Sequence, residues 1–306
     1  MTMTEIRRME NGAPDAAAAG TFELGGDLEV RRLGFGAMRL PGPGVWGEPK
    51  DPDGAKVVLR RAIELGANLI DTAGFYGPEV ADRLIAEALH PYPEDLVIAT
   101  KVGVKRGPDK SWNPHARPKE LRADVEGDLR RLKLERLDLV YLRLGDGRVL
   151  EDSEVPLAES FGALAELKEE GKIRHLGLSS ITLETLEEAR KIAPVVAVQN
   201  LYNLANRSSE ALLEACEEEG IAFVPFFPLA IGELAKPEGR VVEIASRRRA
   251  TPAQITLAWL LARSPAILLI PGTSSVTHLE ENVTAASIQL SEEEIEELAD
   301  AVPVSG

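Results

Sequence analysis

The pattern of hydrophobic and polar positions changes period repeatedly along the chain. Short apolar runs typical of strands buried on both faces alternate with longer segments whose apolar residues are spaced three and four apart, as in amphipathic helices. The predicted strands are Leu33–Met38, Asn68–Asp71, Leu96–Lys101, Leu137–Leu142, Ile173–Leu178, Val195–Gln199, Ile221–Pro225 and Ala266–Ile270. The predicted helices are Asp53–Leu65, Glu79–Leu89, Pro118–Leu132, Pro156–Glu170, Leu183–Ile192, Ser209–Glu219, Arg240–Arg248 and Pro252–Ala262.

This alternation of strands and helices, without an intervening linker, predicts an α/β fold, a single-domain (β/α)8 TIM barrel over residues 21–306. An open doubly wound sheet is the alternative, but no Gly-x-Gly-x-x-Gly follows the first strand. Binding sites of such barrels lie where the strands end, at the C-terminal rim. Two segments longer than ordinary barrel turns, Val102–Arg117 and Leu229–Gly239, are expected to be loops on that rim.

The two ends of the chain add smaller elements. Residues 1–20 have only a four-alanine apolar run between Asp15 and Gly20, so they lack a secretory signal and are predicted to be a disordered tail. Thr21–Glu29 contains a Gly-Gly-Asp turn and predicts a hairpin. Ser291–Ala299 opens with Ser-x-x-Glu, a capping box, and predicts an outer helix.

Composition narrows the class of protein. The 35 basic and 50 acidic residues give a net charge of −15, and no basic tract stands apart, so no nucleic-acid partner is expected. No segment approaches the roughly 20 apolar residues of a membrane span, so no membrane partner is expected either. Cys216 is the only cysteine, which excludes an intramolecular disulfide and suits the reducing cytoplasm. We expect a cytoplasmic monomer or weak homo-oligomer.

The segment ANLIDTAGFYGP, residues 67–78, combines a short apolar strand with polar chemistry. The strand ends in Asp71, and Tyr76 follows in a turn flanked by glycines. Alone, this is also typical of a strand, a helix cap and a surface aromatic. However, the next strand ends in Lys101, and a lysine there needs an anion, which Asp71 on the neighbouring strand could supply.

The other strand ends bring further polar or small residues to the same rim. They are Gly36-Ala37-Met38, Arg143, Ser179-Ser180, Gln199, Phe226 and Pro271-Gly272. Such a set indicates an active site, although a buried polar plug whose members satisfy one another is the alternative. His90, His115 and His175 show no metal-ligand spacing, so no metal is predicted and these residues are interpreted as structural or surface histidines.

Two motifs resemble the aldo/keto reductase family: IDTAGFYG, and a strand ending in Thr-Lys, here IATK. The resemblance extends from about Leu33 to about Leu298. Three further segments, LPGPGVWG, VPFFPL and LLIPGTSSVTHLEEN, are similar to the bacterial branch of NADPH-dependent pyridoxal reductases. The resemblance implies a barrel enzyme that transfers hydride from NADPH to an aldehyde or ketone, with pyridoxal as a candidate substrate and pyridoxine as its product.

Reduction of a carbonyl leaves an alkoxide that needs a proton. A free phenol, with a pKa of about 10, is a weak acid at neutral pH, and a nearby ammonium lowers the pKa of a phenol. The resemblance makes Tyr76 the proton donor, with Lys101 and Asp71 behind it. Arg143 stands where the family usually has histidine; an arginine keeps its proton, which leaves Tyr76 as the acid. The alternative for Arg143 is an ion pair with Asp146.

The resemblance also implies a site for NADPH on the rim. Ser179, Ser180 and Gln199 would hold the carboxamide, although the family usually has asparagine where Ser180 stands. Phe226 would stack on the nicotinamide, and 227–229 would begin the pyrophosphate loop; ordinary core aromatics are the alternative. The predicted cofactor-binding residues are Gly36, Ala37, Met38, Asp71, Ser179, Ser180, Gln199, Phe226, Phe227, Pro228, Leu229, Gly232, Pro271, Gly272, Thr273, Ser274, Ser275, His278, Glu281 and Asn282.

The last residues of that set, 271–282, are expected to contact the phosphate on the 2′-oxygen of NADPH. Residues 271–275 precede a predicted helix, whose N-terminal amides and hydroxyls can bind phosphate. Many relatives use a lysine and an arginine for this phosphate, and Gly272 and His278 stand in their places. The hydroxyls of Thr273, Ser274 and Ser275 therefore predict a preference for NADPH over NADH, and a modest one.

Two tryptophans are predicted to contact the small carbonyl substrate. Trp112 lies in the long segment Val102–Arg117 and Trp46 in LPGPGVWG, and both are expected as apolar walls. A disordered surface loop around Trp112 is the alternative. A second hypothesis for the whole protein is a redox-sensing module that binds NADPH and turns over slowly. The intact set of Asp71, Tyr76 and Lys101 favours the enzyme.

Overall fold

A curled parallel sheet forms the centre of the protein. The computed structural model describes residues 14–144, 155–226, 228 and 239–301. Adjacent strands of the sheet run parallel in the order β3, β4, β5, β7, β8, β9, β10. Their bounds are β3 Phe35–Gly36, β4 Leu69–Asp71, β5 Val97–Arg106, β7 Leu137–Arg143, β8 Ile173–Ser179, β9 Ala197–Gln199 and β10 Ala222–Phe223. All carboxyl ends therefore lie on one rim.

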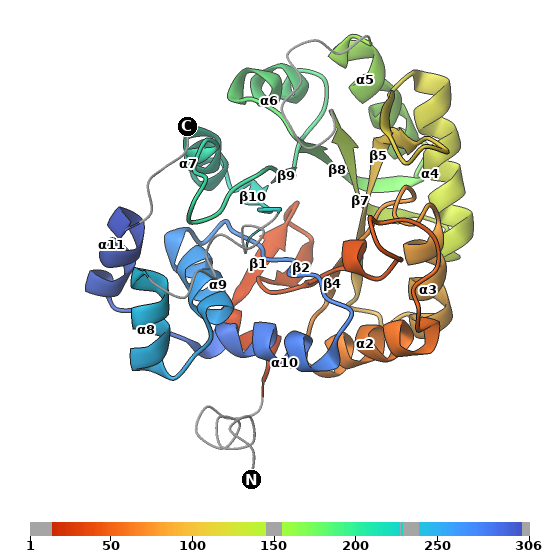
Figure 1. Cartoon of the computed structure of the whole chain (residues 1–306). Helices are drawn as coiled ribbons and strands as arrows, with labels where there is room; N and C mark the ends of the chain where they lie inside the picture. Colours follow the sequence, from red (N-terminus) through yellow and green to blue (C-terminus); the bar gives the residue numbers. More distant parts are fainter. Residues whose placement is uncertain (1–13, 145–154, 227, 229–238, 302–306) are drawn as a thin grey trace.

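Helices surround this sheet (Figure 1). They are α2 Pro52–Glu64, α3 Val80–Leu89, α4 Pro118–Leu132, α5 Leu157–Glu169, α6 Leu183–Arg190, α7 Glu210–Glu218, α8 Arg240–Arg248, α9 Pro252–Arg263, α10 Val276–Thr284 and α11 Glu292–Ala301. Local sequence explains several starts: Asp51 accepts a hydrogen bond from the Gly54 amide, and Thr251 with Gln254 forms a capping box. These helices lie within one or two residues of the predicted bounds.

The predicted strand Ala266–Ile270 does not form a regular ladder. It makes isolated parallel bridges, Ile267 with Phe223 and Leu269 with Leu33, and so links the two edges of the sheet. The backbones crowd together here: a Cβ on Gly36 would lie 2.5 Å from the Ile270 carbonyl oxygen. The prediction of a strand over Leu33–Met38 was too long, because residues 37–39 form the 3-10 helix η2, Ala37–Arg39.

The N-terminal hairpin is confirmed. Strands β1, Thr21–Leu24, and β2, Leu28–Arg31, pair antiparallel, and the hairpin packs into the interior of the curled sheet (Figure 1). The predicted tail ends earlier than Gly20, because Ala16–Ala19 form a 3-10 helix whose first amide donates to the Leu65 carbonyl at 2.8 Å. Residues 1–13 lie outside the described part of the chain.

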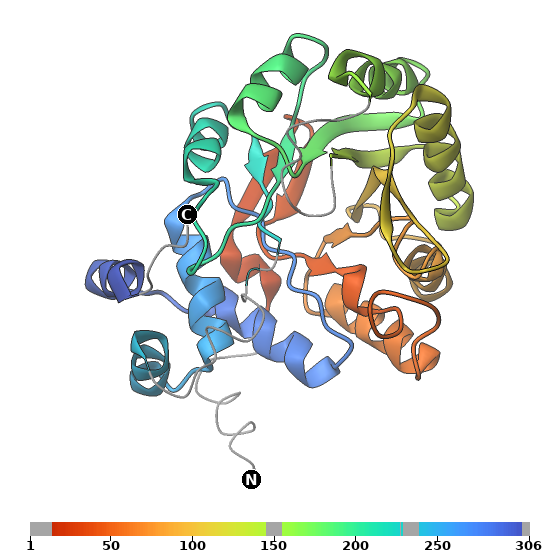
Figure 2. The same cartoon turned by 45° about the horizontal axis from the view of Figure 1, so that its top comes forward.

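The predicted rim loop Val102–Arg117 is a β-hairpin instead. Strand β5 continues to Arg106, turns, and pairs antiparallel with β6, Trp112–His115. Figure 2 shows this hairpin beside α4. The buried positions Val102 and Val104 explain the correction, because their side chains pack in the core and keep the strand extended. Of the second predicted loop, Leu229–Gly239, only Gly239 is described.

The capping box of the last helix is confirmed. The Glu294 amide donates to Ser291 Oγ at 3.3 Å, and the Ser291 amide donates to Glu294 Oε2 at 3.0 Å.

Among the described residues, no helix is both long enough and apolar enough to cross a membrane.

Candidate active site

A buried ion pair lies where strands β4 and β5 end. Asp71 lies opposite Ala99 in the parallel register, so Lys101, two residues further on, also points to this rim. Lys101 Nζ donates to Asp71 Oδ1 at 2.5 Å and to the Thr72 carbonyl oxygen at 2.9 Å. Lys101 is 1% exposed and Asp71 3% exposed. The predicted pairing of these two residues is therefore present.

The surroundings keep Lys101 charged. Burial by itself lowers the pKa of a lysine, but the Asp71 carboxylate and the Tyr76 phenol outweigh it, so the pKa of Lys101 is raised above its ordinary value. Gln199 Nε2 donates to the other Asp71 oxygen, Oδ2, at 2.9 Å. Gln199 therefore orients the carboxylate, a contact that the sequence analysis did not predict.

Tyr76 lies against this ion pair. Lys101 Nζ is 4.9 Å from the centre of the Tyr76 ring, and Tyr76 is 3% exposed. The Tyr76 amide donates to the Ala73 carbonyl at 2.9 Å, which closes the turn after β4. Phe75 packs edge-on against the Tyr76 ring with centroids 5.3 Å apart. The three residues Asp71, Tyr76 and Lys101 thus form one cluster.

Arg143 and two aromatic rings form a wall beside this cluster. The Arg143 guanidinium carbon lies 5.7 Å from the Trp112 ring centre and 5.7 Å from the Phe226 ring centre. Trp112 in turn packs edge-on against Phe75 at 5.6 Å. Trp112 therefore lies beside the cluster, and its contact with a substrate stays a prediction. The alternative partner of Arg143, Asp146, lies outside the described residues.

Arg106 joins the two tryptophans, and the sequence analysis missed it. Its guanidinium carbon lies 4.2 Å from the Trp112 ring centre and 5.3 Å from that of Trp46. It also donates to the Val45 carbonyl at 3.1 Å, so it ties residues 44–46 to the hairpin. The sequence does carry a signal for this contact. Side chains alternate between two faces along β5, and this alternation continues to Arg106, which is buried.

Ser179 and Ser180 lie at the end of β8. Both hydroxyls are buried, and within the described part of the chain neither has a hydrogen-bond partner. Ser180 has a φ of 62°, and its amide donates to the Gln199 carbonyl at 3.0 Å. Buried hydroxyls are usually hydrogen-bonded, so each of these two atoms has unused hydrogen-bonding capacity at the end of β8.

The remaining predicted cofactor residues do not all lie at one place. Met38, Gly272, Thr273 and Ser274 line one cavity of about 540 Å³. The side chains of Ser275, His278, Glu281 and Asn282 do not line it: Ser275 Oγ caps α10 by accepting from the His278 amide at 3.4 Å. Ala37 and Pro271 are buried, and Pro228 is half-buried. Phe227, Leu229 and Gly232 lie outside the described residues.

A buried polar network supports the cluster from behind, and the sequence analysis missed it as well. Thr72 Oγ1 donates to Asp82 Oδ1 at 2.7 Å, and Thr100 Oγ1 donates to Asp128 Oδ2 at 2.7 Å. Arg131 donates to both carboxylates. Burial, with the nearby negative charge of Asp82, raises the pKa of Asp128 well above its usual range.

This network contacts both strands that carry the ion pair, β4 and β5. Thr72 directly follows Asp71, and Thr100 directly precedes Lys101. It also reaches the Tyr76 turn, since a Cβ on Gly74 would lie 2.5 Å from Asp128 Oδ1. The available signal was the pair Asp128 and Arg131, three apart on the buried side of α4.

Away from this cluster, His115 and His175 each pair with a carboxylate, whereas His90 packs against an aromatic ring. His115 Nδ1 lies 3.0 Å from Asp124 Oδ2, and His175 Nε2 lies 2.6 Å from Asp27 Oδ1. His90 packs edge-on against Tyr92 with ring centroids 5.5 Å apart. Over the residues that the structure describes, no group of three or more histidine, cysteine or acidic side chains could hold a metal ion.

Comparisons with known proteins show which family the chain is similar to. The model of the aldo/keto reductase family matches residues 32–303. Pyridoxine 4-dehydrogenase of Escherichia coli K12 is 50% identical over 278 residues, which cover 90% of this chain and 96% of that protein.

Solved structures of aldo-keto reductases are also similar to this chain. A thermostable aldo-keto reductase in complex with the inhibitor epalrestat has a TM-score of 0.79 at 34% identity, covering 91% of this chain and 98% of that one. An aldo-keto reductase of Klebsiella pneumoniae in complex with NADPH has a TM-score of 0.77 at 28% identity, covering 91% and 93%. The resemblance found in the two sequence motifs is therefore confirmed, and the chain belongs to the aldo/keto reductase family.

Proposed function

We propose that this protein is an NADPH-dependent reductase of aldehydes and ketones, built as one complete (β/α)8 domain. The observation that carries the proposal is the buried Lys101 ammonium between the Asp71 carboxylate and the Tyr76 ring. NADPH, when bound, supplies the hydride for the carbonyl carbon. The protein must then supply a proton to the carbonyl oxygen, and Tyr76 is the acid at this place.

The cluster is arranged for that proton transfer. As Tyr76 gives its proton to the developing alkoxide, the phenol becomes an anion, and the Lys101 charge beside it offsets the new charge. Asp71, itself oriented by Gln199, holds Lys101 without taking its proton, since the pKa of Lys101 is raised. Arg143 retains its proton and can donate hydrogen bonds to an oxygen of the substrate.

Residues on the rim are proposed to hold the cofactor. Ser179 and Ser180 present buried hydroxyls to its carboxamide, and Phe226, half-buried beside Arg143, is placed to stack on the nicotinamide. The Klebsiella relative was solved with NADPH, which supports this choice of cofactor. Because Gln199 Nε2 already donates one hydrogen to Asp71, its contact with the carboxamide would use the amide oxygen or the second amide hydrogen.

Pyridoxal, reduced to pyridoxine, is the substrate we propose. The 50% identical relative is named pyridoxine 4-dehydrogenase, and pyridoxine is the product of the reduction proposed for this chain. The walls beside Tyr76 suit a flat aromatic aldehyde: Trp112 and Phe75 are apolar, and Arg143 can bind a ring oxygen. Trp46, which packs against Arg106, would close the outer side of the proposed substrate site.

The test is the substitution Tyr76→Phe. We expect it to leave the dissociation constant of NADPH nearly unchanged and to slow reduction of pyridoxal by about a hundredfold or more, the usual effect of a general acid. Tyr92→Phe is the matched control, because the Tyr92 hydroxyl donates to the Leu132 carbonyl away from the site. Unchanged turnover in Tyr76→Phe, measured as NADPH oxidation at 340 nm, would refute the assignment of the acid.

A further inference from the structure

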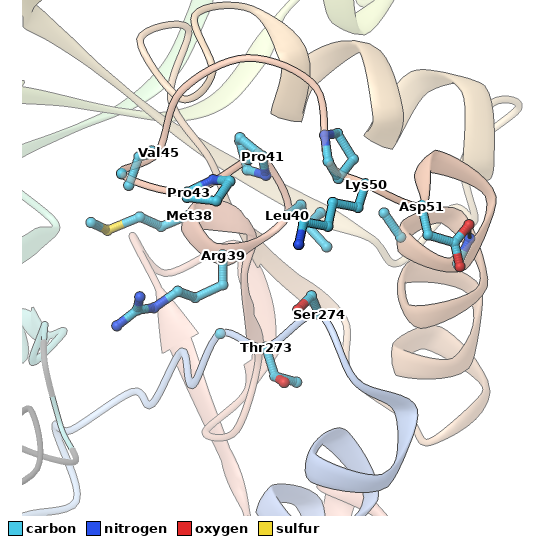
Figure 3. Close-up of a pocket in the computed structure, with 16 residues that line it drawn as sticks. Met38, Arg39, Leu40, Pro41, Pro43, Val45, Lys50, Asp51, Thr273 and Ser274 are labelled. Atoms are coloured by element: carbon cyan, nitrogen blue, oxygen red, sulfur yellow. Dashed lines mark hydrogen bonds between the residues drawn. The ribbon is translucent and has the colours of Figure 1, made fainter. Parts of the chain in front are cut away.

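The cavity beside Thr273 and Ser274 has a second wall that the sequence analysis did not consider. Its volume is about 540 Å³, and it lies between these residues, the segment after η2, and the start of α2. Figure 3 shows Arg39 and Lys50 at this cavity, across from Thr273 and Ser274. A cavity of this size is large enough for a nucleoside-sized group.

The cavity has a positive lining in a strongly acidic protein. The chain carries a net charge of −15, yet two cations, Arg39 and Lys50, line this hollow. Within the described residues neither side chain makes an ion pair or a side-chain hydrogen bond. Asp51 also lines the cavity and accepts the Gly54 amide at 2.8 Å at the start of α2, so one negative charge stands against two positive charges. The lining therefore favours an anion.

The opposite wall provides hydrogen-bond donors. Thr273 Oγ1 accepts the Ser275 amide at 3.1 Å, which leaves the Thr273 hydroxyl hydrogen to donate. Ser274 is exposed at the edge of the cavity. Pro41 and Pro49 make part of the remaining lining apolar and rigid. Two cations, two hydroxyls and an apolar surface are the partners of a phosphate carried on a nucleoside.

We propose that this cavity binds the 2′-phosphate of NADPH, with Arg39 and Lys50 as its cationic partners. The inference rests on the proposed NADPH dependence. It gives the phosphate a source of positive charge on this chain, where Gly272 has no side chain to offer and the His278 side chain does not line the cavity. The two cations come from before α2, on the far side of the cavity from Thr273 and Ser274.

The test compares ligands that differ by this phosphate. Dissociation constants of NADP⁺, NAD⁺ and adenosine 2′,5′-bisphosphate are measured by calorimetry for the wild type, Arg39→Ala and Lys50→Ala. We expect each substitution to weaken NADP⁺ and the bisphosphate about tenfold, which corresponds to about 1.4 kcal/mol, and NAD⁺ less than about twofold. The losses should shrink at high salt, because both cations are exposed.

Lys191→Ala is the control. Lys191 is an exposed lysine at the end of α6, so this substitution removes the same charge away from the cavity. Equal weakening of NADP⁺ and NAD⁺, or no weakening of either, would overturn the proposal. So would a change confined to the Michaelis constant of a phosphorylated aldehyde. These binding measurements need no turnover, so they test the phosphate site separately from the reaction. If NADP⁺ binds through Lys50 but no aldehyde is reduced, only the proposed function is contradicted.

Discussion

The buried pair of Asp71 and Lys101 allows a quantitative test by a double-mutant cycle. The substitutions are Asp71→Asn, Lys101→Met and the two together. At 2.5 Å, two unit charges attract by about 7 kcal/mol with an effective dielectric constant of about 20. Removing both charges from water costs several kcal/mol for each ion, so the net contribution of the intact pair to stability is small.

Each single substitution leaves one buried charge without its partner. Lys101→Met leaves the Asp71 carboxylate with Gln199 alone, and Asp71→Asn leaves the ammonium with the Thr72 carbonyl and a neutral amide. We expect each to lower the free energy of unfolding by about 3–5 kcal/mol. The double variant has no charge left at these two positions and keeps an acceptor for Gln199, so it should lose less than either single variant.

The assay is equilibrium unfolding in urea, followed by circular dichroism, with Lys191→Met as the exposed-lysine control. All three site variants should lose aldehyde reduction. The double variant should therefore recover stability relative to the single variants without recovering activity. Coupling below about 0.5 kcal/mol, with the double variant equal to the sum of the singles, would show that the two side chains do not interact as described.

The same pair predicts a dependence of stability on pH. The folded-state pKa of Lys101 is raised above its ordinary 10.5, so its contribution is fully present below pH 10.5 and is lost as the pH rises through the higher folded value. The wild type should therefore lose stability on alkalinisation more steeply than Lys101→Met. Identical alkaline profiles for the two proteins would contradict this.

Three further predictions concern the rim and the last helix. Arg143→His should introduce a limb near pH 6.5, the ordinary pKa of histidine, in the pH profile of reduction, whereas Arg143→Met should weaken substrate binding without one; untouched rates in both would make Arg143 structural. Trp112→Ala should raise the Michaelis constant of an aromatic aldehyde and leave that of NADPH nearly unchanged; an effect on neither would remove Trp112 from the substrate site. Hydrogen bonds from Arg248 lower the pKa of Glu294 to about 2 from 4.5, so its stabilisation should be lost between pH 4.5 and 2, measured by melting temperature; Glu294→Gln should abolish this loss while Glu293→Gln retains it.

The order of elements and the cluster of Asp71, Tyr76 and Lys101 could be read from the sequence. Helices such as α4, predicted and found at Pro118–Leu132, follow from a period of hydrophobic positions that local chain geometry produces. Asp71 and Lys101 were predicted to meet because parallel strands bring their carboxyl ends to one rim, whatever the details of packing. Tyr76 follows Asp71 closely enough that the turn alone keeps it there.

The contacts that close and support the site depend on tertiary structure. The segment around Leu269 pairs with Leu33, far away in the chain, so no local pattern shows that it forms bridges rather than a ladder. Arg106 holds Trp46 and Trp112 only because the hairpin folds over residues 44–46.

The same limit applies behind the catalytic cluster. Gln199 reaches Asp71 across the curled sheet, and Asp82 meets Asp128 through Arg131 between two helices. Hydrophobic periodicity reports which face of an element is buried, whereas the partner across that face is chosen by packing of the whole chain and by the need to satisfy buried charge.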